Sequence, residues 1–189
     1  MARSSSSASQ VGRIVTVSSG EIEDGTIIIE GGRIKAVGKG LEVPWNATVV
    51  KYPRGTAMPG LIAAHTTMGL RVPNENVPNA PYISVLDGID PSSQAVKSSL
   101  RDGITAAHVI PANATRIGGQ GAVVRTTGRT VDEMVIASPS GIKISLRPPP
   151  GETRMQNIAT LRRTFLDLHA QVKEVAMEAS PPGLLAAKP

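Results

Sequence analysis

Cysteine is absent from this 189-residue chain. Its absence excludes disulfides, thiolate metal ligands and cysteine nucleophiles together. A chain without cysteine is typical of a reducing compartment, so we expect a cytoplasmic protein.

Aromatic residues are almost absent as well, since the chain holds only Trp45, Tyr52, Tyr82 and Phe165. The core must therefore be built from Val, Ile, Leu, Ala and Met. Unpaired bases are usually bound by stacking on aromatic rings. The basic residues behind the net charge of +5 are scattered rather than clustered. We therefore expect no nucleic-acid partner.

Long apolar runs are also missing. No stretch approaches the ~18 residues of a membrane span, so none is expected. Residues 1–10 are serine-rich and lack the apolar middle of a secretory signal. We predict a disordered tail there, with a short transit-like segment as the alternative.

Residues 11–57 are predicted to form a small β-domain. Strands are expected at 13–17, 25–30, 33–38 and 48–52, and Gly31-Gly32 between two of them is a two-residue hairpin signal. A Pro-Gly turn then opens onto Leu61-Ile62-Ala63-Ala64 without alternation, which is typical of a strand buried on both faces. His65 follows at the C-terminal tip of that strand.

The Met58-Pro59-Gly60-Leu61-Ile62 run followed by His65 resembles the signature of the amidohydrolase superfamily, in particular its imidazolonepropionase-like members. The resemblance extends over about residues 11–146. It implies an α/β fold: an N-terminal β-sandwich portion (11–57), then an incomplete (β/α) barrel fragment (58–150). In this family a His-x-His pair on the first barrel strand binds Zn²⁺, which activates water for C–N hydrolysis.

The chain departs from that signature at two positions. Thr67 stands at the second histidine and Ala63 stands where the family usually has aspartate. A threonine hydroxyl is a poor ligand for zinc. His65 is thus the one candidate metal ligand, and we predict no catalytic or cofactor-binding residue and no cofactor. A divalent metal such as Zn²⁺ is expected only if another chain completes the site.

Three other side chains bear on the same chemistry. Lys143 on the expected third strand is a candidate for a bridging carbamate, but it lacks the partner histidines. His108 lies in the second barrel strand among apolar neighbours and is expected to be a hydrogen-bonded core or interface histidine. His169 is expected on the surface. No Gly-x-Ser-x-Gly elbow is present, so a serine mechanism has no sequence support.

The barrel fragment is expected to contain a β-α-β unit. A Pro- and Asn-rich loop from Arg71 to Pro91 precedes a helix that Ser92 or Ser93 caps and that Asp102-Gly103 ends. A buried strand follows at 104–110. We interpret Gly118-Gly119-Gln120-Gly121 as a tight turn, with anion binding as the alternative. A third strand, parallel to the first two, is predicted at 141–146.

Residues 151–179 are predicted to form an amphipathic helix, before a tail at 180–189. Apolar residues recur along it at spacings of three and four, typical of a helix with one apolar seam. The seam packs either on the protein's own sheet or, as a partner interface, on another chain. Its members are Ile158, Leu161, Phe165, Leu168, Val172 and Val175.

A complete barrel of this type takes about 250 residues, and a partial one has open sheet edges. We therefore expect a truncated, catalytically incompetent amidohydrolase-like protein that serves as a structural or interaction subunit with other protein chains, in a hetero- or homo-oligomer. One alternative is half of a split metal-dependent amidohydrolase completed by another chain. Another is a small-molecule binding module formed by residues 71–91 and 118–121.

Overall fold

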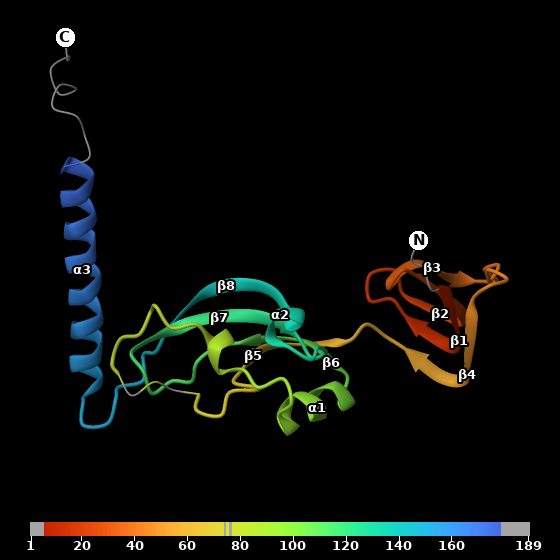
Figure 1. Cartoon of the computed structure of the whole chain (residues 1–189), viewed down its shortest axis with the longest axis horizontal. Coiled ribbons are helices and arrows are strands. Elements are labelled where there is room, and N and C mark those ends of the chain that lie inside the picture. Colours follow the sequence, from red (N-terminus) through yellow and green to blue (C-terminus); the bar gives the residue numbers. More distant parts are fainter. Residues whose placement is uncertain (1–5, 74, 76, 179–189) are drawn as a thin grey trace, which may run out of the picture. The chain divides into compact units, whose positions relative to one another are not determined.

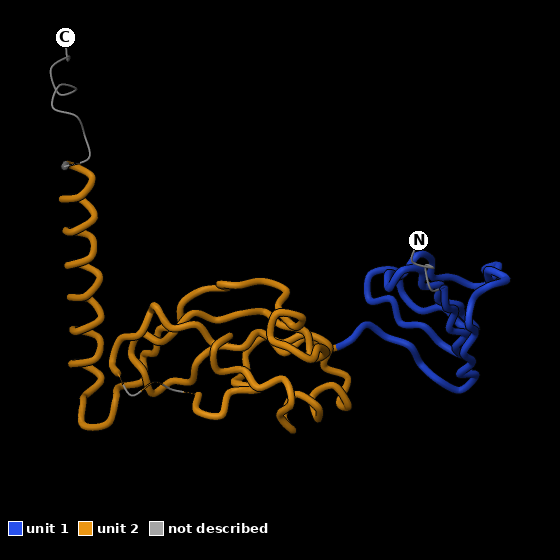
Figure 2. The backbone as a smooth tube through the Cα atoms, viewed as in Figure 1, with its two compact units in different colours: residues 1–60 blue, residues 61–189 orange. Residues whose placement is uncertain are grey.

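The computed structural model describes residues 6–73, 75 and 77–178. The chain divides between Gly60 and Leu61 into two compact units (Figure 2). Each unit holds one four-stranded sheet (Figure 1). The fold is thus mixed α/β, with a small β unit first.

The first unit consists of β1 (Ser6–Val15), β2 (Glu21–Glu30), β3 (Arg33–Lys39) and β4 (Thr48–Ala57). Their order in the sheet is β3-β2-β1-β4, and only β1 and β4 run parallel. Gly31 and Gly32 have φ of 57° and 75°, values that a two-residue hairpin turn demands. The predicted Gly-Gly hairpin is confirmed.

The predicted tail at residues 1–10 is wrong for Ser6–Gln10, which form the first half of β1; residues 1–5 lie outside the described residues. β1 is a central strand, so its backbone pairs with β2 on one side and with β4 on the other. Ala8 is fully buried there. Strand pairing on both sides overrides the low β-propensity of the serines.

The second unit contains a sheet of order β5-β6-β7-β8, formed by β5 (Leu61–Thr66), β6 (Ile104–Val109), β7 (Ile117–Arg125) and β8 (Val135–Ile144). Only β5 and β6 pair in parallel. β8 runs in the same direction as β5 and β6, as predicted for the third strand, but it does not pair with them, because the antiparallel β7 lies between β6 and β8. The short connections at 110–116 and 126–134, the latter holding only the one-turn α2 (Val131–Met134), cannot make a parallel crossover.

The predicted helix before β6 is confirmed as α1 (Gln94–Arg101). The Ser93 hydroxyl accepts a hydrogen bond from the Val96 backbone N–H at 3.4 Å, and Gly103 follows the helix with a φ of 84°. These are the expected N-cap and C-terminal signals. The preceding loop contains a 3-10 turn, η1 (Val85–Gly88).

The core of the second unit lies where α1 and η1 pack against β6 and β7. It holds aliphatic side chains and methionines and no aromatic ring, as the composition predicted. Its members are Met68, Val85, Ile89, Val96, Ala107, Val109, Ala122, Val124 and Met134.

The glycine-rich segment 118–121 lies within β7, so the predicted tight turn is wrong. The reason is close packing. A Cβ at Gly119 would lie 2.5 Å from the Ile83 carbonyl oxygen, and one at Gly118 would lie 3.3 Å from the Lys143 Cβ. These glycines let the loop and β8 approach the strand closely.

The last described element is α3 (Arg154–Glu178), close to the predicted bounds. Its first two turns contact the rest of the unit, where Asn157 and Leu161 are buried. From Phe165 to Met177 its side chains are exposed. In the described part of the chain, no helix combines the length and apolarity that crossing a bilayer would need.

Candidate functional site

His65 lies at the C-terminal end of β5, as the sequence predicted, and its imidazole meets a side chain from β8. The strand and His65 are largely exposed, so the predicted burial of this strand on both faces is wrong. The Lys143 ammonium lies 3.2 Å from His65 Nε2. An ammonium group can only donate, so Nε2 accepts this hydrogen bond and the proton of the neutral ring lies on Nδ1. The Nε2 lone pair of His65, which could otherwise bind a metal, thus accepts a hydrogen bond from the Lys143 ammonium group.

The residues around His65 do not fit a zinc ion. Thr67 and Ala63 provide no imidazole or carboxylate beside it. Across residues 6–73, 75 and 77–178, no group of three or more His, Cys, Asp or Glu side chains is placed to hold a metal. One imidazole paired with an ammonium group is not a zinc donor set.

His108, on β6, is fully hydrogen-bonded. Its Nδ1 lies 3.2 Å from the Ala64 carbonyl oxygen and its Nε2 lies 2.8 Å from the Ser140 hydroxyl. This confirms the prediction of a satisfied histidine. His169 is exposed on α3, also as predicted.

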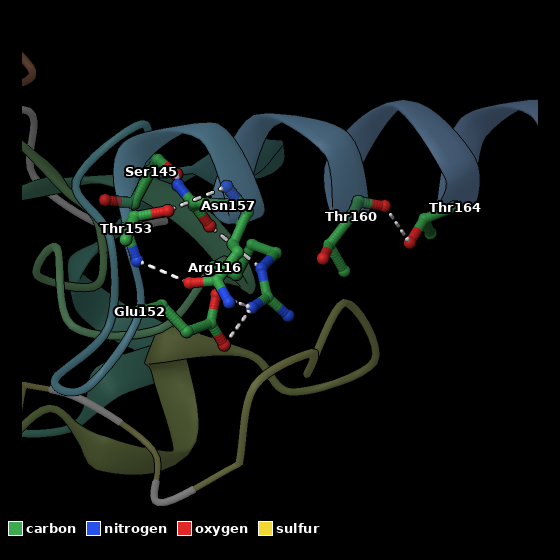
Figure 3. A network of polar contacts seen from close by, with 8 residues as sticks. Arg116, Ser145, Glu152, Thr153, Asn157, Thr160 and Thr164 are labelled. Atoms are coloured by element: carbon green, nitrogen blue, oxygen red, sulfur yellow. Dashed lines mark hydrogen bonds and ion pairs between the residues drawn. The ribbon is translucent and has the colours of Figure 1, made fainter.

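A polar network at the base of α3 escaped the sequence analysis. Arg116 is only 5% exposed. Its Nε donates to Asn157 Oδ1 at 2.9 Å, and its Nη2 donates to both carboxylate oxygens of Glu152 at 2.5 and 2.6 Å (Figure 3). Asn157 also donates to the Ser145 carbonyl oxygen at 3.4 Å. The network thus joins the residue just before β7, the segment between β8 and α3, and the first turn of α3.

The fold of this chain is similar to that of a solved structure. An amidohydrolase from Thermotoga maritima MSB8 is similar to the chain with a TM-score of 0.80 and 24% sequence identity, over 91% of this chain and 50% of that one. This chain has an amidohydrolase-like fold. It spans about half the length of the Thermotoga protein.

A second structure adds little to that amidohydrolase-like match. The ochratoxinase of A. niger gives a TM-score of 0.33 and 17% identity over 54% of this chain and 24% of that one, which is too low to carry an argument. No protein-family model matches the sequence, and no curated protein does either.

The predicted interface seam divides into two parts in the amidohydrolase-like second unit. Leu161 is buried and Ile158 is half-buried, against the body of the unit. The remaining four members are exposed, so the helix's own unit does not cover them. They are Phe165, Leu168, Val172 and Val175.

The segments considered for small-molecule binding do meet in space. A cavity of about 150 Å³ lies between the loop and β7, lined among others by Val72, Ile83, Asp87 and Gly119. The volume is below the ~300 Å³ typical of ligand pockets. The cavity therefore gives no specific support to the alternative of a small-molecule binding module.

Proposed function

We propose that the chain is an amidohydrolase-like interaction subunit, catalytically incompetent in metal-dependent hydrolysis, whose second unit docks on a further polypeptide. The observation that carries this proposal is the state of the two edge strands, β5 and β8. Within the described residues each pairs on one side only. Their exposed side chains include many apolar ones: Leu61, Ile62, Ile136, Ile142 and Ile144.

Such edges favour association. An unpaired strand offers a row of backbone N–H and C=O groups to another strand, and soluble monomers usually protect it with charge or proline. β8 contains Pro139 and Lys143, whereas β5 contains neither a proline nor a Lys, Arg, Asp or Glu, so β5 is the less protected edge. Ile62, in β5, is 72% exposed. A partner that adds a strand beside β5 would both satisfy the backbone and cover this side chain.

The proposed lack of metal-dependent activity rests on the few candidate metal ligands at the C-terminal end of β5. Thr67 cannot replace an imidazole, and Lys143 occupies the Nε2 lone pair of His65. The four exposed members of the seam on α3 are proposed as a second contact with other chains.

Hydrogen exchange tests the docking proposal. Amide exchange is measured on the free chain and on the chain in its native complex. We expect peptides from β5 and β8 to gain protection in the complex. Peptides from β2, which is already paired on both sides, provide the control. Equal exchange of β5 in both states would contradict docking at this edge.

One contact favours a second candidate, half of a split metal-dependent amidohydrolase. Lys143 lies beside His65, the positions at which the resemblance places a carboxylated lysine and the first ligand. In that case another chain supplies the missing histidines and aspartate. Metal-dependent hydrolysis of a cyclic amide by the complex, lost with His65→Ala, would establish this candidate over the first.

A further inference from the structure

Two side chains from β6 and β8 meet across β7. Nε2 of His108 lies 2.8 Å from the Oγ of Ser140. This is the separation expected between a nucleophilic hydroxyl and its general base. Ser140 is exposed, so small molecules can reach its hydroxyl from solvent.

A third group orients the imidazole. Nδ1 of His108 lies 3.2 Å from the Ala64 carbonyl oxygen of β5. A carbonyl oxygen only accepts, so Nδ1 of the neutral ring carries the proton and Nε2 presents its lone pair. The Ser140 O–H therefore donates to Nε2. The base has the tautomer needed to take the serine proton.

Glycine makes the meeting possible. A Cβ at Gly121 would lie 2.9 Å from the Ser140 hydroxyl oxygen and 3.1 Å from His108 Nε2. Any side chain at this position of β7 would push the two groups apart. Gly141, directly after Ser140, has a φ of 143°, a conformation that other residues rarely adopt. Both glycines thus fix the position of the hydroxyl.

We propose that Ser140 and His108 form a nucleophile and general-base pair that accepts acyl groups from activated esters. The inference goes beyond the proposed function and does not rest on it, because no metal takes part. Ser140 Oγ bonds to the ester carbonyl carbon while its proton passes to His108 Nε2. The bond to the alcohol oxygen then breaks, and that oxygen leaves with the proton as the free alcohol.

The acyl group leaves Ser140 by the reverse route. Water bonds to the acyl carbon, His108 Nε2 takes one proton from it, and the Ser140 oxygen recovers a proton as the carboxylic acid departs. The substrate class follows from the setting. An exposed serine on a strand contributes no deep pocket, so esters with a good leaving group and a small acyl chain are expected.

The test uses the full chain with 4-nitrophenyl acetate. Release of nitrophenol is followed in time, and the acetylated residue is located by mass spectrometry. We expect acetyl on Ser140, loss of that labelling with Ser140→Ala, and a fall of about a hundredfold with His108→Gln. Ser138→Ala, at another exposed serine of β8, provides the matched control and should react like the unchanged chain.

Two further measurements separate chemistry from folding. Added imidazole should restore part of the rate to His108→Gly but none to Ser140→Ala, which a purely structural role would not produce. The chain unfolded in urea should lose the Ser140 labelling. Acetylation spread over lysines, or labelling of Ser140 that is indifferent to His108, overturns the proposal.

Discussion

The ammonium nitrogen of Lys143 lies 3.2 Å from Nε2 of His65, so a side chain from β8 reaches the histidine at the tip of β5. Gly118, in β7, lies under this lysine, and a Cβ there would already be 3.3 Å from the Lys143 Cβ. The contact joins the two edge strands of the second sheet.

The first prediction concerns the missing imidazole. Thr67→His should restore a two-histidine pair at the end of β5 and raise the affinity for Zn²⁺ about tenfold or more over the unchanged chain. Isothermal titration with Zn²⁺ measures this change. Ile62→His adds an imidazole elsewhere on the same strand and should leave the affinity unchanged. Equal gains in both variants would show that the site has no special geometry.

The second prediction concerns the anchoring of α3. Asn157→Ala leaves the buried Nε of Arg116 without its acceptor and should lower the free energy of unfolding by about 1–3 kcal/mol. Arg163 and Asp167 form an exposed pair at 3.9 Å on the same helix. Arg163→Ala should therefore change stability by no more than about 0.5 kcal/mol. Urea titration of both variants tests the difference, and comparable losses would argue against the network as the anchor.

The third prediction separates the two parts of the seam. Leu168 is 48% exposed and belongs to the seam, whereas Leu166 is 63% exposed and lies off it. Leu168→Glu should weaken association with other chains without changing the stability of the isolated chain. Leu166→Glu should leave association intact. Analytical ultracentrifugation measures the association of both variants. Equal effects of the two substitutions would contradict the seam as an interface.

Leu161, in contrast, is only 6% exposed. Leu161→Glu places a charge against the body of the second unit and should detach α3 from it. Loss of protection of the α3 amides in hydrogen exchange measures this. Retained protection at the base of the helix would mean that the polar network alone holds it.

The fourth prediction concerns pH. Hydrogen bonds from the Ser92 hydroxyl, at 2.7 Å, and from its backbone N–H, at 2.8 Å, lower the pKa of Asp90. The ionised carboxylate therefore favours the folded state above its unfolded pKa, and this contribution disappears as the pH falls through the folded pKa. Ser92→Ala should raise the pKa of Asp90, measured by NMR titration. Ser93→Ala, which removes the α1 cap instead, should not.

The sequence predicted correctly those turns and helix ends that residues close together in the chain determine. The capping serine and the terminating glycine define α1, and Gly31-Gly32 defines the hairpin. The amidohydrolase-like fold was predicted from the Pro-Gly-Leu-Ile stretch before His65. In each case the decisive residues lie within one turn or one strand of the feature they specify.

The predictions were wrong where contacts between residues far apart in the sequence determine the structure. Ser6–Gln10 form a strand because β2 and β4 pair with them, and Gly119 lies in a strand because the Ile83 carbonyl approaches it. Arg116 meets Glu152 and Asn157 across 36 and 41 positions. Ser140 meets His108 across 32 positions, without any elbow motif. No local pattern in the sequence predicts such contacts.

Native mass spectrometry of the protein isolated gently from its source tests the central claim most directly, because it reports bound chains and bound metal together. The account predicts a complex with another polypeptide and no stoichiometric metal. A stable monomer, or a complex that carries one or two metal ions per copy of this chain, would contradict it.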